Sequence, residues 1–395
     1  MKKITRNADY TKQYNRKLLL KLLLKMPMSR ADLARDTGLT RASISIITEE
    51  MLQSGILKEL APVSAERGRS PVPLSVNPEA FYAFGVFLNR KKCSAGLVDI
   101  SGRCEILTEI PLTGKEAPAP VIEALCDAMK DRLEKQPDIK ARLLGIGISC
   151  PGPLKLGQGV ILNPPGFEGW HHTPIARELS SRLELPAFVW DNADALALYN
   201  HRFGPRRDIS DFLLLLVDTG IGSGIVMKDK IYHGAGAASP ELGHISIRYD
   251  GRPCSCGNRG CLEAYAAIPN LLSQAGWPYP DWHQVIAHLD EPAAKSLLDT
   301  EADYLAAGLI TALNLFDLRT IYLAGDILTG FEKISSRIQQ RLQQPPALRE
   351  KAPVLLLPSH TDKDYETIAG ANIIFSMFLD SAPFCQASLP PKTAF

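Results

Sequence analysis

Residues 244–263, HISIRYDGRPCSCGNRGCLE, place one histidine and three cysteines at a spacing that suits a metal ion. The pattern is H-x9-C-x-C-x4-C, formed by His244, Cys254, Cys256 and Cys261. Three thiolates and one imidazole, with no position left for water, favour a structural, tetrahedral zinc ion (Zn2+). Two glycines before Cys261 permit the tight backbone of such a knuckle. The alternative is a loop of reduced thiols, but the Gly, Asn and Arg neighbours explain apolar burial poorly.

Two carboxylates flank this segment. Glu241 precedes His244 by three residues, and Glu263 follows Cys261 by two. A metal that fixes the histidine and the cysteine also fixes these carboxylates near each other. Charged oxygens held in place accept short, charge-assisted hydrogen bonds, so the pattern favours a binding role for the pair. The alternative is that both glutamates are ordinary surface charges.

The charge of the chain is unevenly distributed. The net charge is +1 over 395 residues, of which 45% are apolar. Residues 1–76 hold 14 Lys or Arg and 7 Asp or Glu, a balance of +7 that leaves −6 for the rest. A basic head on an acidic body indicates a polyanionic partner for the head alone. A solvated, lysine-rich surface is the alternative.

Two short helices are predicted in the head, within SRADLARDTGLTRASISIITEEMLQSGIL. Ser29 suits the N-cap of the first helix and Gly38 its left-handed end, while Thr40 caps the second helix and Gly55 ends it. The helical period of the second helix turns one set of residues inward, namely Ile44, Ile47 and Met51. It leaves Arg41, Ala42, Ser45 and Glu49 outside.

The remainder of the head predicts a winged helix–turn–helix domain over residues 1–78. YNRKLLLKLLLKM supplies a third helix, and ILKELAP and PVPLSV form two strands of a wing joined by VSAERGRS. We expect the domain to bind a double-stranded DNA operator. Base edges are assigned to Arg41 and Ser45, and phosphates or a minor groove to Arg67 and Arg69. Thr40 and Ala42, at the start of the same helix, are also expected to be DNA-binding residues. A protein-docking module is the alternative.

Beyond the head, strand patterns alternate with helix patterns, which predicts an α/β body in two lobes. The first lobe is assigned to residues 79–195, completed by a closing helix at 365–380, and the second to 196–364. A membrane span and a signal peptide are not expected, so we assign the cytoplasm. In that reducing compartment the scattered cysteines are expected to be buried thiols: Cys93, Cys104, Cys126, Cys150 and Cys385.

Several motifs occur in an order that resembles the ROK family of sugar kinases and sugar-responsive repressors. They are GRSPVPLS, the PGP of residues 151–153, DTGIGSG, ELGH and CSCGNRGCLE. The last two motifs together are highly specific, and the resemblance spans roughly residues 10–380. It implies an actin-like, ribonuclease-H-like pair of α/β lobes behind a winged helix, assembled as a homodimer or homotetramer.

The resemblance also implies a sugar pocket. It would contain Asn163, Asp191, Asn192, Glu241, His244 and Glu263, with the histidine contributing its other ring edge while bound to the metal. One departure lies beside the pocket. Ser239-Pro240 precedes Glu241 where the family usually has Ala-Gly, so the preferred sugar is expected to differ.

Three further departures concern phosphate transfer. The first kinase phosphate loop resembles DxGGT, but this chain has FLNRK, with Phe87, Asn89, Arg90 and Lys91 in place of the Asp, the two glycines and the Thr. The second resembles GTGxGxG, and DTGIGSG introduces Asp218 there. The third is the base: in the family pattern E-N-D-A-N the Asp removes the proton, and Asn192 takes its position.

Adjacent Asp191 would face the other way on an extended backbone, although a strand ending one residue earlier would let it turn inward. The sequence therefore predicts a DNA-binding transcriptional regulator, a repressor, that is not an enzyme and takes a sugar or sugar phosphate as effector. One alternative is an ATP-dependent hexose or amino-sugar kinase with an accessory DNA-binding head. Another is a DNA-binding protein whose body serves only for assembly.

Overall fold

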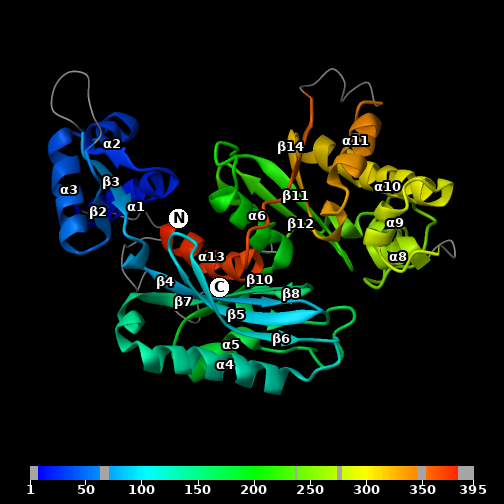
Figure 1. The fold of residues 1–395 in the computed structure, drawn as a ribbon, viewed down its shortest axis with the longest axis horizontal. Helices are drawn as coiled ribbons and strands as arrows, with labels where there is room; N and C mark the ends of the chain where they lie inside the picture. Colours follow the sequence, from blue (N-terminus) through cyan, green and yellow to red (C-terminus); the bar gives the residue numbers. More distant parts are fainter. Residues whose placement is uncertain (1–7, 63–70, 236–237, 274–277, 345–352, 381–395) are drawn as a thin grey trace. The chain divides into compact units, whose positions relative to one another are not determined.

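The computed structural model describes residues 8–62, 71–235, 238–273, 278–344 and 353–380 (Figure 1). Contacts divide the chain into two compact units, residues 1–190 with 364–395, and residues 191–363. The first unit contains the head and one α/β sheet, and the second contains another α/β sheet. Each unit is described separately below.

Three helices form the head: α1 (Ala8–Lys25), α2 (Arg30–Thr37) and α3 (Arg41–Gln53). The predicted caps are confirmed. The Ser29 side chain accepts a hydrogen bond from the backbone N–H of Asp32, whose carboxylate in turn accepts from the backbone N–H of Ser29. Gly38 ends α2 at φ 70°, a left-handed conformation that glycine adopts without steric cost. Thr40 caps α3, accepting from the N–H of Ser43.

A three-stranded sheet completes the head, in the order β1-β3-β2. It consists of β1 (Met28–Ser29), β2 (Leu57–Glu59) and β3 (Pro73–Val76), of which the wing pattern predicted the last two. The buried core of the head comes from all six elements and includes Leu19, Leu20, Leu33, Ile44, Met51, Leu57 and Leu74. The leucine-rich face of α1 is therefore an internal face of this small domain.

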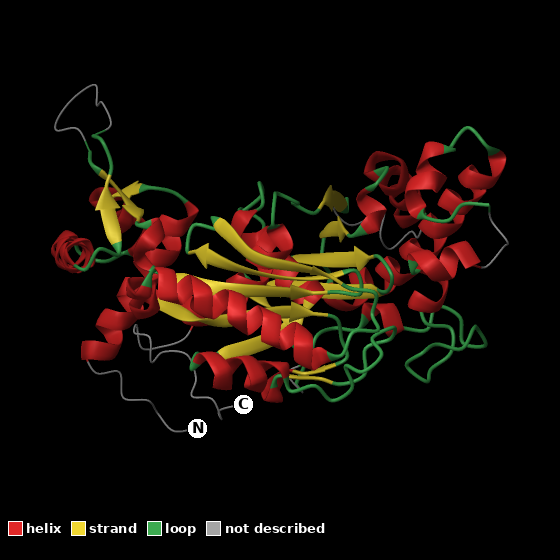
Figure 2. Cartoon of the chain, turned by 60° about the horizontal axis from the view of Figure 1, so that its bottom comes forward, coloured by secondary structure: helices red, strands yellow, loops and turns green. Residues whose placement is uncertain are grey.

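The first body sheet has five strands in the order β10-β7-β4-β5-β6. Its strands are β4 (Tyr82–Leu88), β5 (Lys92–Asp99), β6 (Cys104–Pro111), β7 (Leu143–Cys150) and β10 (Ala187–Asp191). β4 pairs antiparallel with β5 and parallel with β7. The helices α4 (Pro118–Lys135) and α5 (Ile175–Leu183) cover one face of the sheet in Figure 2, and they enclose an apolar core with it.

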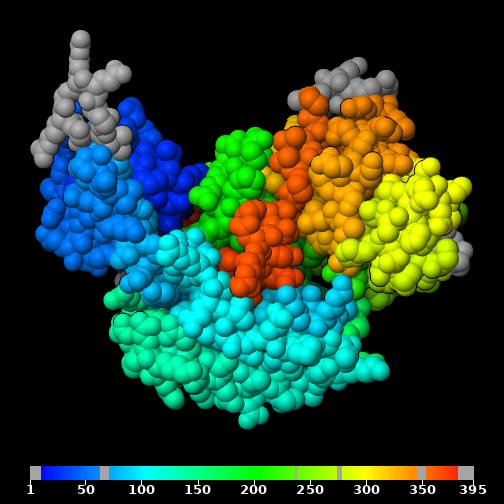
Figure 3. All heavy atoms as spheres, viewed as in Figure 1, coloured from blue at the N-terminus to red at the C-terminus, as the bar shows by residue number. Residues whose placement is uncertain are grey.

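The closing helix α13 (Tyr365–Asp380) covers the other face of this sheet, as its apolar sequence predicted. In the space-filling view of Figure 3 the orange-red atoms of α13 lie against the cyan atoms of the sheet. Glycine makes this approach possible, because a Cβ atom at Gly147 would lie 2.0 Å from the Gly370 carbonyl oxygen. The sequence segments around residues 147 and 370 therefore pack backbone to backbone.

The second unit repeats the same strand order. Its sheet runs β13-β12-β11-β14-β15, formed by β11 (Phe212–Val217), β12 (Ile221–Met227), β13 (Lys230–Ile231), β14 (Thr320–Ala324) and β15 (Leu355–Pro358). In both sheets the first strand lies centrally, antiparallel to the second and parallel to the fourth. Two sheets of one topology match the predicted actin-like body.

Helices of the second unit pack on its sheet. The helix α6 (Asn192–Phe203) contacts β11 and β12, whereas α10 (Pro292–Phe316) and α11 (Phe331–Leu342) enter an apolar core with the short helices α8 (Ile268–Ser273) and α9 (Trp282–Ala287). Within the described ranges, every helix is too short or too polar to cross a bilayer.

Candidate functional site

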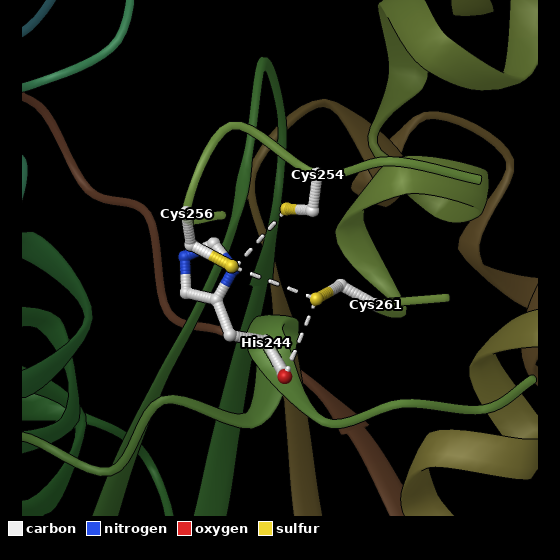
Figure 4. Close-up of side chains that lie close together, drawn as sticks. All are labelled: His244, Cys254, Cys256 and Cys261. Atoms are coloured by element: carbon white, nitrogen blue, oxygen red, sulfur yellow. Dashed lines mark hydrogen bonds between the residues drawn. The ribbon is translucent and has the colours of Figure 1, made fainter. Parts of the chain in front are cut away.

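The histidine and the three cysteines of the second unit meet around one point (Figure 4). His244 ends a short 3-10 turn (Leu242–His244), and the cysteines lie on the loop that follows. Backbone bridges Ser246↔Cys261 and Pro253↔Arg259 fold this loop back on itself. A backbone hydrogen bond between the Leu262 N–H and the Ile245 carbonyl returns the end of the loop to its start.

The distances within this cluster suit a tetrahedral zinc ion. The four ligand atoms all lie within 4.8 Å of one another. The sulfurs of Cys256 and Cys261 are 3.7 Å apart, and the Cys254 sulfur is 3.6 Å from Nδ1 of His244. Zn–S bonds of about 2.3 Å and Zn–N bonds of about 2.0 Å in a tetrahedron would separate these atoms by about 3.8 and 3.6 Å. The donor set and its spacing therefore fit the ion.

Glycine makes the sharp turns of this loop possible. Gly257 and Gly260 have φ angles of 90° and 72°. A Cβ atom at Gly260 would lie 1.6 Å from the carbonyl oxygen of Arg248, which leaves no room for any side chain. The sequence-based expectation of a tight backbone between Cys256 and Cys261 is thus confirmed.

The Glu263 side chain connects the metal loop to the glycine turn between β11 and β12. Glu263 begins the short helix α7 (Glu263–Ala266), and its Oε2 accepts a hydrogen bond of 2.9 Å from the backbone N–H of Ile221. A Cβ atom at Gly220 would lie 2.8 Å from the same oxygen. The Oε2 atom of Glu263 is thus a hydrogen-bond acceptor for the turn.

Glu241 lies near this carboxylate. The residue is exposed as a whole, yet partial burial of its carboxyl raises the pKa. The His244 imidazole lowers that pKa, while the negative charges of Glu263 and Asp194 raise it further. Two neighbouring carboxyl groups therefore act on Glu241 at this place in the second unit.

Asp191 and Asn192 stand at the junction of β10 and α6. Asp191 caps the helix, its Oδ1 accepting a hydrogen bond of 2.8 Å from the N–H of Ala193. Asn192 begins the helix and is buried. A Cβ atom at Gly222 would lie 3.7 Å from Asp191 Oδ1, so the helix start also borders the glycine turn. The strand β10 ends at Asp191 itself, and the Asp191 carboxylate caps the start of α6.

Of the predicted sugar-binding residues, the second unit contains five, all close to the glycine turn or the metal loop: Asp191, Asn192, Glu241, His244 and Glu263. Asn163 is exposed on a loop after β9 (Val160–Ile161) and belongs to the first unit. The candidate site therefore consists of the five residues of the second unit.

Sequence reasoning missed a buried polar cluster centred on Asp194. Its Oδ2 accepts from the Ser239 hydroxyl at 2.5 Å and lies 2.9 Å from Nε2 of His233. Asp194 has no exposed surface, and its Oδ1 has no hydrogen-bond partner among the described residues. The unusual Ser239-Pro240 dipeptide was the available signal, but the sequence separation of 45 positions between Asp194 and Ser239 concealed their contact.

The segment FLNRK forms a closed turn between β4 and β5. The Oδ1 atom of Asn89 accepts hydrogen bonds of 2.8 Å from the backbone N–H groups of Lys91 and Lys92. Arg90 donates to the carbonyl oxygen of Pro165 at 2.6 Å. In a phosphate-binding loop such backbone N–H groups would face the ligand. Here two of these N–H groups, those of Lys91 and Lys92, already donate to the side chain of Asn89.

The outward face of α3 is as the sequence predicted. Arg41, Ala42 and Ser45 are exposed, and Thr40 is exposed at the N-cap. Ile46, which the sequence analysis did not select, is 61% exposed on the same face. Arg67 and Arg69 lie outside the described residues.

A surface pocket of about 370 Å³ also lies in the second unit and is formed largely by the metal loop between His244 and Cys254. Its lining residues are Arg248, Asp250, Gly251, Arg252, Tyr265 and Tyr304. None of them is a predicted sugar-binding or metal-binding residue. The Arg252 guanidinium lies over the Tyr265 ring, 4.8 Å from its centre, and Arg248 pairs with Asp250. The pocket is thus a feature separate from the carboxylate cluster.

Comparison with known proteins places these features in a family. The ROK family model matches residues 84–377. The xylose repressor of Bacillus spizizenii is 28% identical over 379 residues, covering 95% of this chain and 98% of the repressor. The DNA-binding transcriptional dual regulator NagC of Escherichia coli is 27% identical over 391 residues, covering 92% and 93%.

Two solved structures are also similar. A ROK family transcriptional regulator, a homolog of the E. coli MLC protein, has 27% identity and a TM-score of 0.77, covering 93% of this chain and 96% of that one. The ROK hexokinase of Thermus thermophilus has 27% identity and a TM-score of 0.62, covering 75% and 98%. The regulators thus align along nearly the whole chain, whereas the hexokinase aligns with three quarters of it.

Proposed function

The chain belongs to the ROK family, and we propose that it is a sugar-responsive, DNA-binding transcriptional repressor without kinase activity. The observation that carries this proposal is the head: three helices, of which α2 and α3 are capped, and a three-stranded sheet precede the body, with the outward face of α3 exposed. This arrangement is typical of a winged helix–turn–helix, in which the second helix of the motif enters the major groove. The names of the similar repressor and regulator support the same function.

In this proposal the body senses the ligand. A sugar or sugar derivative binds near Glu241 and Glu263, whose carboxylates accept hydrogen bonds from its hydroxyl groups. Asp191, Asn192 and His244 complete the site in the second unit. The effector changes the affinity of the protein for its operator, because it binds the two functional states unequally.

Zinc shapes this site. The ion would be held by His244, Cys254, Cys256 and Cys261, and it would supply structural cross-linking of the loop. The loop orders the residues on either side of it, Glu241 before and Glu263 after. The histidine uses Nδ1 toward the cysteines and keeps Nε2 for the other side.

Two features of the chain argue against phosphate transfer. Asn89 satisfies the N–H groups of Lys91 and Lys92 that a phosphate would need. Asn192 stands where the kinases of the family have their catalytic Asp, and an amide does not accept a proton at neutral pH. We further propose an even-numbered oligomer, a homodimer or homotetramer, on a palindromic operator.

A direct test uses the purified full-length protein with short DNA duplexes selected from a random pool, measured by fluorescence anisotropy. Binding that changes on addition of one sugar from a panel of neutral and phosphorylated sugars is expected. Glu241→Gln should keep DNA binding and lose the sugar response. Asp250→Asn, an exposed carboxylate near the metal loop but outside the site, is the matched control and should respond normally.

The kinase alternative is tested with ATP and the same sugar panel. We expect no phosphorylated sugar to form. Turnover at ordinary enzyme rates, on the order of 1 per second or faster, would instead identify an active kinase with an accessory head.

A further inference from the structure

The recognition helix α3 exposes one large apolar side chain, and this side chain has no function in the head itself. Ile46 is 61% exposed, whereas its neighbours on the inner face, Ile44 and Ile47, are buried at 0% and 6%. An exposed isoleucine gains nothing from folding, because its side chain remains in water. A single exposed apolar residue is ordinary, so only its position on the helix can indicate a function.

That position is the centre of the outward face. Residues three and four apart lie next to each other on a helix, so Ile46 adjoins Ala42 and Glu49. Ala42 and Glu49 are exposed with it. The described part of the head exposes two other large apolar side chains, Tyr14 and Met26, and both lie outside α3. Ile46 is therefore the one large apolar side chain on the face that the proposed function directs into the major groove, within the described part of the head.

The polar neighbours are less available for base recognition than the sequence suggested. The Ser45 hydroxyl donates to the Arg41 carbonyl oxygen at 2.9 Å, so its proton is used within the helix. The side-chain oxygen of Thr40 is already hydrogen-bonded to Ser43 at the start of the helix. Ala42 has no polar group, and its small side chain lets the helix approach the groove floor closely.

Glu49 makes base edges a better target for this face than phosphates. Its carboxylate is exposed, one turn beyond Ile46, and accepts from the Gln53 amide at 3.1 Å. A carboxylate is repelled by phosphates but accepts hydrogen bonds from the amino group of cytosine. The middle of the face thus offers the duplex an apolar group beside a negative one.

The major-groove edge of a base pair presents one apolar group, the C5-methyl of thymine. We infer that Ile46 reads a thymine methyl group in each operator half-site, with Ala42 beside it, and so determines sequence specificity. This inference rests on the proposed function and adds to it the residue and base that discriminate. Arg41 at the start of the helix is then left for a phosphate or a guanine.

The test replaces each thymine of a selected duplex by uracil, which removes only the methyl group and keeps every hydrogen bond. We expect the full-length protein to lose about fourfold in affinity for each thymine contacted, the factor equivalent to about 0.8 kcal/mol per buried methyl group. Ile46→Ala should bind the thymine and uracil duplexes equally. Ile46→Val should retain most of the difference, because it still presents methyl groups.

Met26→Ala is the matched control, an exposed apolar side chain of the head outside α3, and should discriminate like the unchanged protein. Equal binding of thymine and uracil duplexes by the unchanged protein would overturn the inference and leave the proposed function intact. Discrimination that persists in Ile46→Ala would also overturn it, by assigning the methyl to another residue. No DNA binding at all by the unchanged protein would overturn both.

Discussion

The side-chain ammonium of Lys17 donates a hydrogen bond of 2.7 Å to the backbone carbonyl oxygen of Phe378. Lys17 is on α1 of the head and only 5% exposed, and Phe378 is in the last turn of α13. The carbonyl groups at a helix C-terminus lack partners within the helix and carry partial negative charge, so a cation is favourable there. The ammonium also lies 5.3 Å from the centre of the Phe378 ring. One buried residue thus ties the head to the closing helix of the first sheet.

Lys17→Ala should therefore lower the free energy of unfolding by about 1–3 kcal/mol, because a buried carbonyl loses a charged donor. Lys21→Ala is the matched control on the same helix. Its ion pair with Asp380 is partly exposed, so about 1 kcal/mol or less is expected. Urea unfolding of the full-length variants measures both. A larger loss in Lys21→Ala than in Lys17→Ala would contradict the role assigned to Lys17.

Metal analysis of the freshly purified protein should return about one zinc ion per chain. Cys256→Ser should lose the ion, lower the melting temperature and weaken the sugar-induced thermal shift, because Glu241 and Glu263 are no longer ordered by the loop. Cys104→Ser, on β6 of the other unit, should keep the full zinc content. A metal-free protein in which Cys254, Cys256 and Cys261 react freely with an alkylating agent would refute the zinc site.

The Asp194 cluster predicts that Ser239→Ala costs about 1–3 kcal/mol of stability, since the buried carboxylate loses its closest donor. The same variant should alter sugar affinity, because Ser239 lies two residues before Glu241. Ser273→Ala removes an exposed hydroxyl from the same unit and should change stability by about 0.5 kcal/mol or less. An unchanged unfolding midpoint and sugar affinity in Ser239→Ala would show that the cluster positions nothing.

Glu301 predicts a pH dependence of stability. This residue of α10 has no exposed surface, and both carboxylate oxygens lack hydrogen-bond partners among the described residues. Burial raises its pKa well above the ordinary value. The folded protein therefore keeps the proton while the unfolded chain releases it above about pH 4.3, so stability falls with rising pH by at most about 1.4 kcal/mol per unit. The fall ends once pH exceeds the raised pKa.

Glu301→Gln removes this titration. Its stability relative to the unchanged protein should rise from pH 4 to neutrality, as measured by urea unfolding at a series of pH values. Glu134→Gln, which removes an exposed carboxylate from α4, is the matched control. Parallel pH profiles for Glu301→Gln and the unchanged protein would refute the prediction.

The sequence by itself determined the features that depend on neighbouring residues. The caps at Ser29, Gly38 and Thr40 were predicted because a capping side chain acts on N–H groups two or three residues away. The cysteine loop was predicted for the same reason, since its ligands lie within 18 residues and their spacing limits the geometry.

The tertiary structure alone decided which distant residues meet. The Glu263 carboxylate accepts a hydrogen bond from the N–H of Ile221, and the Asp194 carboxylate accepts one from the Ser239 hydroxyl. The Asn89 side chain accepts from the backbone N–H of Lys91, in the turn where a kinase would bind a phosphate. Local propensity carries no information about the first two contacts, because they depend on how sheets and helices pack after the chain has folded.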